Sequence, residues 1–291
     1  MKEGRPISDR MTSLAMFLVR TIPGWLGPSV AMWAGRIFAR LRPGERDIVE
    51  SNLSAVLGAD NPRRLRMFAI KALGHAALAY YELYRLPALS REKIVAMVRL
   101  DEPGWTKFKE AHAQGKGIII VSPHLSSYDL GGQSLVARGF PICALVLPDQ
   151  LEGMAFANWK RTFQGTKVLS LSAAALREIM RYLRGGGIIV TGGERPVKGQ
   201  GIEVEFFGRP TILPDGLARL AMHTGAALIG AACRREKGRY WISFQRIELA
   251  RRGDNEADVR ENTQRLARFM EAAIRLHPEQ WHLLLRLWAG E

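Results

Sequence analysis

The stretch GIIIVSPHLSSYDLGG, residues 117–132, decides the fold class of this 291-residue chain. Residues 117–121 form a short, continuous run rich in β-branched side chains, which is typical of a strand buried on both faces. Pro123 ends that run, and ligand sites in such folds usually lie just beyond the carboxyl end of a strand. His124 and Asp129 therefore stand where a site is expected.

The spacing of His124 and Asp129 restricts how the two side chains can meet. Inside one helix, five steps of about 100° would place them about 140° apart. They can converge only if His124 lies on the loop and Asp129 in the first turn of the next helix. Ser126 would then be the N-cap and Asp129 its partner in a capping box. A purely structural role for Asp129 and a catalytic one both stay open.

A neutral histidine at this place has a specific chemistry. It can take the proton of an acceptor hydroxyl that attacks an acyl carbonyl, while a carboxylate on the other ring nitrogen stabilises the imidazolium. An alternative is a serine esterase, in which Ser126 or Ser127 is the nucleophile and His124 its base. The chain contains no G-x-S-x-G motif, which disfavours that alternative.

Short apolar runs alternate with amphipathic segments after about residue 98. This pattern predicts an α/β fold with a central mixed sheet flanked by helices. We expect an N-terminal helical portion over 1–97, packed with an α/β core over 98–291 as one continuous domain. The expected strands are 117–121, 142–147, 167–169, 187–190, 202–207, 227–232 and 240–247, and the expected helices include 45–57, 62–86, 173–184, 215–224 and 255–276.

The charge balance indicates anionic partners. The chain has 42 Lys and Arg against 28 Asp and Glu, a net charge of +14. Such a surface attracts nucleic acid, an anionic lipid leaflet or an acidic protein. Nucleic acid is disfavoured, because no helix-turn-helix or zinc-finger spacing is present. The two cysteines lie far apart and no H-E-x-x-H motif occurs, so we expect neither a disulfide framework nor a metal.

The N-terminal stretch, residues 11–46, is apolar and aromatic but interrupted by arginine, proline and glycine. No uncharged run reaches the roughly 18 to 20 residues of a membrane-spanning helix, and no signal-peptide pattern is present. These residues are expected to form apolar helices with arginines at their edges. Such helices either lie on a membrane surface or pack on the main domain, and the sequence leaves both open.

Four motifs together resemble a known family. HLSSYD (124–129) fits the H-x4-D/E signature of the glycerolipid acyltransferase superfamily. Three further stretches resemble its lipid A biosynthesis acyltransferase branch, which includes the phosphatidylinositol mannoside acyltransferases: RDIVESNLSAVLG (46–58), GIEVEFFGRPTILPDGLARLAMHTGAALIGAACRR (201–235) and HPEQWHLLLRLW (277–288). The resemblance runs from about residue 10 to 290.

The resemblance implies a membrane-associated enzyme at the cytoplasmic face of the inner membrane. It would move a fatty acyl group from acyl carrier protein or acyl-CoA to a hydroxyl of a glycolipid, either lipid A precursor-like or phosphatidylinositol mannoside-like. His124 matches the general base and Asp129 its partner, without a covalent acyl-enzyme and with no cofactor beyond the thioester co-substrate. A lysophospholipid acyltransferase, or a non-catalytic lipid-binding protein with the same fold, stays open.

Departures from the family pattern concern the acceptor. Relatives often have Gly and Trp inside the first motif, where this chain has Ser126 and Tyr128, and a His-Arg-Arg run where it reads Leu285, Arg286 and Leu287. We therefore expect Ser126 and Tyr128 to contact the substrate and bear on acceptor choice.

The glycine-rich segment 185–208 holds further candidates. Glycines let backbone N–H groups approach a ligand, and Arg or Lys can pair with phosphate. The resemblance places a charged loop of the family here, so Arg195 is assigned to a substrate phosphate and Glu194 to a supporting role, with Arg209 as a second anion contact. Adjacent residues of a strand face opposite ways. Of Phe206 and Phe207, one is expected in the core while the other could line an acyl channel.

Overall fold

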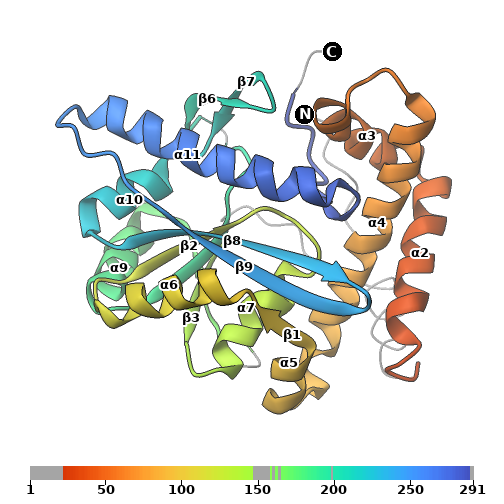
Figure 1. The fold of residues 1–291 in the computed structure, drawn as a ribbon, viewed down its shortest axis with the longest axis horizontal. Coiled ribbons are helices and arrows are strands. Elements are labelled where there is room, and N and C mark those ends of the chain that lie inside the picture. Colours follow the sequence, from red (N-terminus) through yellow and green to blue (C-terminus); the bar gives the residue numbers. More distant parts are fainter. Residues whose placement is uncertain (1–21, 147–157, 159–160, 163–164, 198, 289–291) are drawn as a thin grey trace.

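The computed structural model describes residues 22–146, 158, 161–162, 165–197 and 199–288 (Figure 1). Residues 11–21 of the N-terminal apolar stretch, Leu147 of one expected strand and Lys198 of the glycine-rich segment lie outside the described residues.

The centre of the described fold is a seven-stranded sheet in the order β1-β9-β8-β2-β5-β3-β4. Neighbouring strands run parallel except β8 and β9, which form a long antiparallel pair. The predicted α/β fold with a mixed sheet is therefore confirmed. The strands are β1 (Val98–Leu100), β2 (Ile118–Ser122), β3 (Ile142–Val146), β4 (Lys167–Ser170), β5 (Ile188–Gly192), β8 (Ala227–Glu236) and β9 (Arg239–Ile247).

Helices cover both faces of the sheet (Figure 1). The α-helices are α2 (Gly27–Leu41), α3 (Pro43–Leu57), α4 (Pro62–Arg85), α5 (Arg91–Met97), α6 (Glu102–Ala113), α7 (Tyr128–Ala137), α9 (Ala173–Arg184), α10 (Gly216–Thr224) and α11 (Asn255–Leu276), and short 3-10 turns are η1 (Leu86–Ala88) and η2 (Pro278–Gln280). The helices expected over 173–184 and 255–276 have those bounds. The short α5 and α6 were not predicted.

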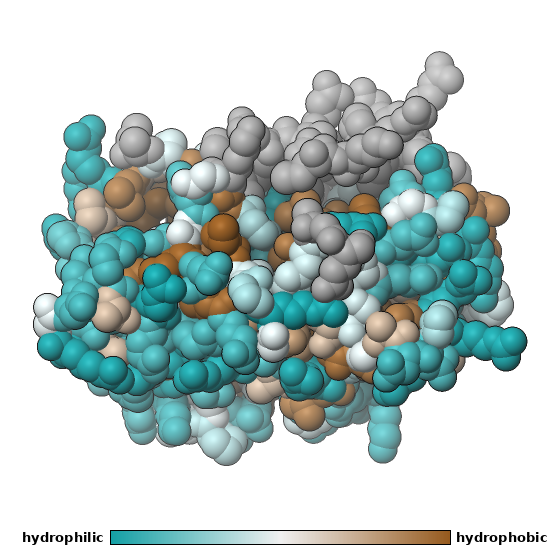
Figure 2. Space-filling model, turned by 90° about the horizontal axis from the view of Figure 1, so that it is seen from above, coloured by the Kyte–Doolittle hydropathy of each residue, from teal (hydrophilic) through white to brown (hydrophobic). Residues whose placement is uncertain are grey.

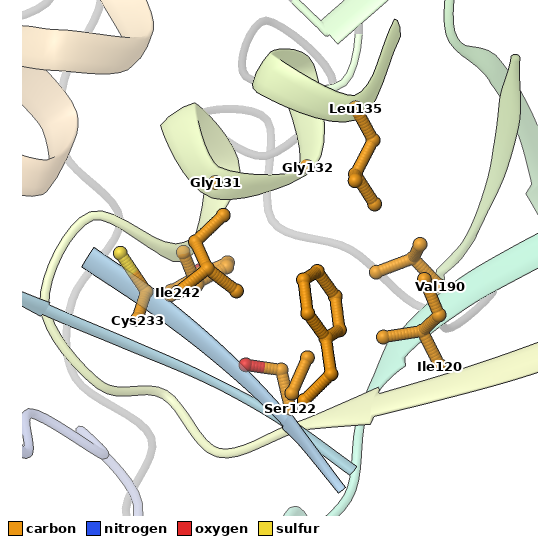
Figure 3. Close-up of a pocket in the computed structure, with 11 residues that line it drawn as sticks. Ile120, Ser122, Gly131, Gly132, Leu135, Val190, Cys233 and Ile242 are labelled. Carbon is orange, nitrogen blue, oxygen red and sulfur yellow. The ribbon is translucent and has the colours of Figure 1, made fainter. Parts of the chain in front are cut away.

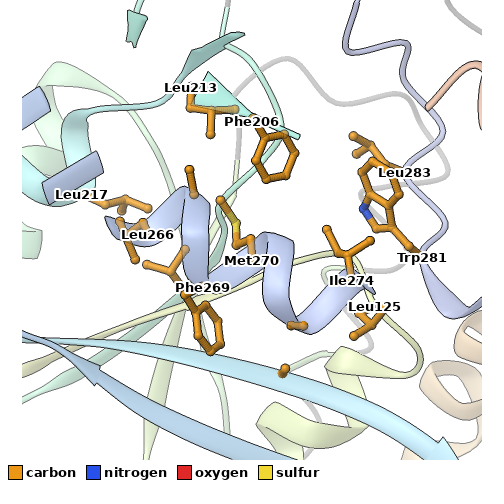
Figure 4. Packing of buried hydrophobic residues seen from close by; sticks show 14 of the residues in the cluster. Leu125, Phe206, Leu213, Leu217, Leu266, Phe269, Met270, Ile274, Trp281 and Leu283 are labelled. Atoms are coloured by element: carbon orange, nitrogen blue, oxygen red, sulfur yellow. The ribbon is translucent and has the colours of Figure 1, made fainter. Parts of the chain in front are cut away.

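The apolar run in β2 is explained by packing on both of its faces. Ile118 and Ile120 belong to the core beneath α6 and α7. Ile119 and Val121 face the other way, into the core that contains Phe269 and Met270 of α11. Figure 4 shows this second core, with the side chains of α11 directed toward the sheet on one side and toward Phe206 and Trp281 on the other. A strand with helices on both faces has no solvent side, so its sequence does not alternate.

The N-terminal helices pack closely on one another. A Cβ atom on Gly35 of α2 would lie 2.7 Å from the Cβ atom of Ala77 of α4, so only glycine permits this approach. Asn61 caps α4 by accepting a hydrogen bond from the backbone N–H of Arg64 at 2.9 Å. One face of α2 therefore packs against α4, and the opposite face points outward.

The expected strand 202–207 lies outside the central sheet. Residues of β6 (Ile202–Phe206) pair antiparallel with β7 (Arg209–Leu213) as a separate hairpin. Phe207 leaves the strand with a φ of 55°, so its ring turns back beside that of Phe206, with 4.6 Å between centroids. Both rings are buried in one core. The expectation that only one of them packs in the core is wrong, because the turn breaks the alternation of the strand.

Candidate active site

His124 and Glu194 meet at the carboxyl edge of the sheet. His124 lies two residues after β2 and Glu194 two residues after β5, and these parallel strands pair with Ser122 opposite Gly192. Nδ1 of His124 lies 3.0 Å from Oε1 of Glu194. The same oxygen accepts the backbone N–H of His124 at 2.6 Å and the indole N–H of Trp281 at 3.3 Å. The loop position expected for His124 is confirmed.

The imidazole of His124 lies directly over the backbone of Gly192. A Cβ atom at position 192 would stand 2.7 Å from Cε1 of the ring, closer than such contacts allow. The glycine at the end of β5 therefore makes room for the ring. Because Nδ1 faces Glu194, the carboxylate favours the tautomer with hydrogen on Nδ1 and leaves Nε2 as a proton acceptor.

Burial and charge act against each other in this pair. Burial disfavours the imidazolium of His124, but the charge of Glu194 and its hydrogen bond outweigh that effect, so the pKa of His124 is raised. Burial likewise disfavours the Glu194 carboxylate, but the His124 charge and hydrogen bonds keep the pKa of Glu194 below its ordinary value. Glu194 is fully buried while the His124 side chain is 24% exposed, so the histidine is the member that a substrate can reach.

Asp129 lies in the first turn of α7, as expected, but its carboxylate does not hold the ring of His124. It forms a two-point ion pair with Arg161, at 2.6 Å from Nε to Oδ1 and 2.9 Å from Nη2 to Oδ2. The carboxylate on the other ring nitrogen of His124 is Glu194. The charge of Asp129 still contributes to raising the pKa of His124. The geometry thus places Asp129 beside the histidine as a neighbouring charge.

The capping-box prediction is wrong. The N-cap of α7 is Ser127, with no side-chain cap hydrogen bond, and α7 begins at Tyr128. Ser126 precedes the helix with a φ of 53°. The hydroxyls of Ser126 and Ser127 are buried, and neither is hydrogen-bonded to His124 among the described residues. Since neither hydroxyl hydrogen-bonds to His124, the site contains no serine nucleophile paired with that histidine.

Tyr128 lies beside His124, at 5.3 Å between ring centroids in an edge-to-face arrangement. Burial raises the pKa of its phenol well above the usual value, so the hydroxyl stays neutral. Tyr128 also stacks near the ring of His282, at 6.1 Å. The first motif and the C-terminal motif therefore contact each other through aromatic rings.

The C-terminal stretch 277–283, which we call the strap, holds the His124 loop in place. The backbone N–H of Ser126 donates to the carbonyl of Gln280 at 2.9 Å, and that of His282 donates to the carbonyl of His124 at 3.1 Å. Nε2 of His282 lies 2.9 Å from the carbonyl oxygen of Ser126. In the sequence, these residues appeared only as part of a family resemblance, because no local pattern indicates a contact over more than 150 positions.

The two candidate arginines lie in different surroundings. Arg195 follows Glu194 and is half-buried, and its charge acts on both His124 and the half-buried Tyr80 of α4. No carboxylate pairs with Arg195 among the described residues. Arg209 begins β7, where its guanidinium lies 5.4 Å from the ring centroid of Trp288. Arg195 therefore lies at the histidine, while Arg209 stacks on an aromatic ring of the C-terminal segment.

A small apolar cavity of about 30 Å³ lies between α7 and the sheet (Figure 3). Gly131 and Gly132 of α7 face it, with Ile120 and Val190 from the strands and Tyr128 at the side of His124. A wider hollow of about 900 Å³ lies at the amino end of α11 and is not lined by His124 or Glu194. Within the described part of the chain, no three His, Cys, Asp or Glu side chains are grouped as metal ligands.

A partly exposed histidine whose Nδ1 faces a buried carboxylate has the geometry to remove a proton from a substrate hydroxyl through Nε2. The family model described as bacterial lipid A biosynthesis acyltransferase matches residues 9–289, so the chain belongs to this family. The predicted resemblance and the enzyme class, an acyltransferase, are confirmed.

Similar proteins include two named phosphatidylinositol mannoside acyltransferase. That of Mycobacterium tuberculosis is 30% identical over 295 residues, covering 99% of this chain and 90% of that protein. That of Mycolicibacterium smegmatis is 29% identical over 297 residues, covering 99% of this chain and 93% of its own length. The similarity therefore includes both the His124 loop and the strap.

Proposed function

We propose that this acyltransferase moves a fatty acyl group from the thioester of acyl carrier protein or acyl-CoA to a hydroxyl of a glycolipid. The observation that carries the proposal is the His124–Glu194 pair, with Nε2 of the more exposed member directed away from the carboxylate. The names of the relatives favour an acceptor like a phosphatidylinositol mannoside, and the family description allows a lipid A precursor.

The proposed step needs no covalent acyl-enzyme. Nε2 of His124 takes the proton of the acceptor hydroxyl while its oxygen attacks the thioester carbonyl carbon. The tetrahedral intermediate then collapses, the C–S bond breaks, and the thiolate leaves with the proton of the imidazolium. Glu194 stabilises that imidazolium and holds its tautomer, in the way a buried carboxylate does beside other catalytic histidines. In the part of the chain that the structure describes, no serine hydroxyl is hydrogen-bonded to His124, which supports direct transfer.

We assign substrate contacts to residues around the pair. Arg195 has no carboxylate partner among the described residues, so its charge is available to a phosphate of the acceptor or of the carrier. Tyr128 and the Ser126 turn border His124, where an acceptor hydroxyl must lie. The pair with Arg161 fixes Asp129 at the start of α7, and the Asp129 carboxylate raises the pKa of the neighbouring imidazole. Arg209 is kept as a weaker candidate for anion contact.

We also propose that the enzyme acts at the cytoplasmic face of the inner membrane. Large apolar side chains lie exposed on and just before α2, at 81% for Trp25, 63% for Trp33 and 49% for Ile37. Exposed Arg40 shares that helix. Figure 2 shows a mostly hydrophilic surface on which apolar side chains gather in a few clusters. No helix among the described residues is long and apolar enough to cross a membrane. A helix with exposed aromatics and arginines suits attachment to an anionic interface.

Acceptor-dependent release of thiol from acyl-CoA or acyl carrier protein tests the proposal. Wild-type protein should release thiol when a hydroxyl-bearing glycolipid is added, and His124→Ala should lose a factor of about 10² to 10⁴ in rate. His112→Ala, which removes an exposed histidine of α6, is the matched control and should keep the wild-type rate. A folded His124→Ala protein with full activity would contradict the proposal. Thiol release with lysophospholipid as the only effective acceptor would favour a lysophospholipid acyltransferase. Binding to vesicles without any turnover would favour a non-catalytic lipid-binding protein.

A further inference from the structure

Three basic side chains lie at the inner surface of α2. Each has a buried nitrogen atom without a hydrogen-bond partner among the described residues. His75 of α4 is 7% exposed, and its Nδ1 has no hydrogen-bond partner among the described residues. The same holds for the buried Nε atoms of Arg36 of α2 and Arg235 of β8. Buried polar atoms in native proteins nearly always have partners, so a group of three without them is unusual.

The three residues are neighbours, since the charges of Arg36 of α2 and Arg235 of β8 both act on His75 of α4. Nη1 of Arg235 lies 3.6 Å from Sδ of Met32 of α2. Arg36 is one turn further along α2, and its Cγ lies 3.2 Å from where a Cβ atom on Gly74 would stand. Gly74 directly precedes His75. After burial itself, the charges of His282, Arg235 and Arg36 all lower the pKa of His75, to about 3, so its ring is neutral and surrounded by positive charge.

Neighbouring carboxylates are already engaged. Burial raises the pKa of Glu82, although the charges of Arg85 and Arg235 oppose that effect. Its carboxyl group is hydrogen-bonded to Arg85 at 2.5 Å and to Tyr240 at 2.9 Å. His277 pairs with Glu236 at 3.4 Å and Glu279 at 3.8 Å. No carboxylate forms an ion pair with Arg36 or Arg235 within the described ranges. Leaving such charges unpaired in a part-buried place is costly unless an anion completes the site.

We propose that Arg36, His75 and Arg235 form a binding site for a phosphate group, supplied first of all by a lipid headgroup. Guanidinium groups match phosphate oxygens geometrically, and a neutral imidazole donates one further hydrogen bond through Nδ1–H. The lipid source follows from the position of Arg36, because the outer face of the same helix exposes Trp33 and Ile37. The site includes neither His124 nor Glu194, so its existence does not depend on the proposed acyl transfer.

Thermal unfolding and phosphate titration test the site directly. Inorganic phosphate should raise the Tm of the wild-type protein and shift the ring resonances of His75 as its pKa rises beside the bound anion. Arg36→Gln and Arg235→Gln should each weaken phosphate binding at least tenfold. In phosphate-free buffer their Tm should equal or exceed the wild-type value, because an uncompensated charge is gone, and this separates lost binding from lost folding. Lys116→Gln removes an exposed charge just before β2, outside α2, and should bind as wild type.

Vesicles separate the two sources of phosphate. Binding to phosphatidic acid vesicles, compared with phosphatidylcholine vesicles, should be weakened tenfold by Arg36→Gln and Arg235→Gln but not by Lys116→Gln. Dependence on Arg36 and Arg235 in the vesicle arm supports a lipid phosphate, and dependence only in the free-phosphate arm supports the site with a soluble phosphate as its ligand. Absence of binding in both arms, or equal binding by all variants, would overturn the site even if acyl transfer is intact.

Discussion

Nδ1 of His124 lies 3.0 Å from Oε1 of Glu194, although 70 positions separate the two residues in the chain. They meet because β2 and β5 are adjacent and parallel, so the residues that follow each strand lie at the same edge. The only oxygen of Glu194 that is hydrogen-bonded among the described residues also holds the backbone of His124 and the Trp281 indole. One buried carboxylate therefore orients the ring, the loop and the strap together.

Gly192→Ala should displace the imidazole. The added methyl group would lie 2.7 Å from Cε1 of His124, so the ring must shift by an appreciable part of an ångström. A misplacement near 1 Å can cost a factor of about 10² in rate. We expect a folded protein with strongly reduced thiol release. Gly216→Ala, at a place with open space around it, is the control and should retain activity. Equal activity of the two variants would show that the Gly192 contact does not position His124.

Asp129→Asn should destabilise the protein. It leaves the Arg161 side chain, which is 9% exposed, without its carboxylate. Breaking a buried ion pair from one side costs about 3–5 kcal/mol in the free energy of unfolding. The double variant Asp129→Asn, Arg161→Met should recover part of that loss. Urea unfolding measures both.

Glu256→Gln provides the comparison, since it breaks the exposed pair of Glu256 with Arg219. Exposed pairs contribute little, so this variant should unfold close to wild type. If Asp129→Asn is as stable as Glu256→Gln and the double variant adds nothing, the pair with Arg161 does not hold the start of α7.

Trp33→Ser combined with Ile37→Ser should weaken binding to anionic vesicles. Burial of one such side chain is worth about 1.5–3 kcal/mol, so losing both should lower partitioning by more than about tenfold. Leu276→Ser is the control, because Leu276 is also highly exposed, at 75%, but is the last residue of α11 and not part of α2. Co-sedimentation with vesicles measures the effect. Partitioning that is unchanged, or reduced equally by Leu276→Ser, would rule out α2 as the contact surface.

Local patterns in the sequence predicted much of this fold. The apolar run of β2 and the periodicity of α9 and α11 depend on neighbours along the chain, and these elements lie where expected. The sequence around a strand does not indicate which other strand it pairs with. The separate hairpin of β6 and β7 was therefore not predicted. The short β1 carries too few residues to show a pattern.

The candidate site could be predicted only in part, because some of its contacts join residues on distant strands. His124 could be singled out because it follows a buried strand, and Asp129 because it stands five positions later. The contact of Glu194 with His124 depends on the sheet order, which places β5 beside β2, and the sequence indicated only a supporting role for Glu194. Arg161 was missed because nothing near residue 161 marks it as the partner of Asp129.

The pH dependence of thiol release, compared between wild type and Glu194→Gln, tests the central claim most directly. His124 must be neutral to accept a proton, so activity should rise with pH through its pKa, which lies above the ordinary value of about 6.5. Without the Glu194 charge and hydrogen bond, burial is the largest remaining effect on the imidazolium, and it lowers that pKa. The account predicts that Glu194→Gln shifts the acidic limb to lower pH and reduces the maximal rate. If the acidic limb of Glu194→Gln stays in place or moves to higher pH, and its maximal rate equals that of the wild type, the proposed role of Glu194 is contradicted.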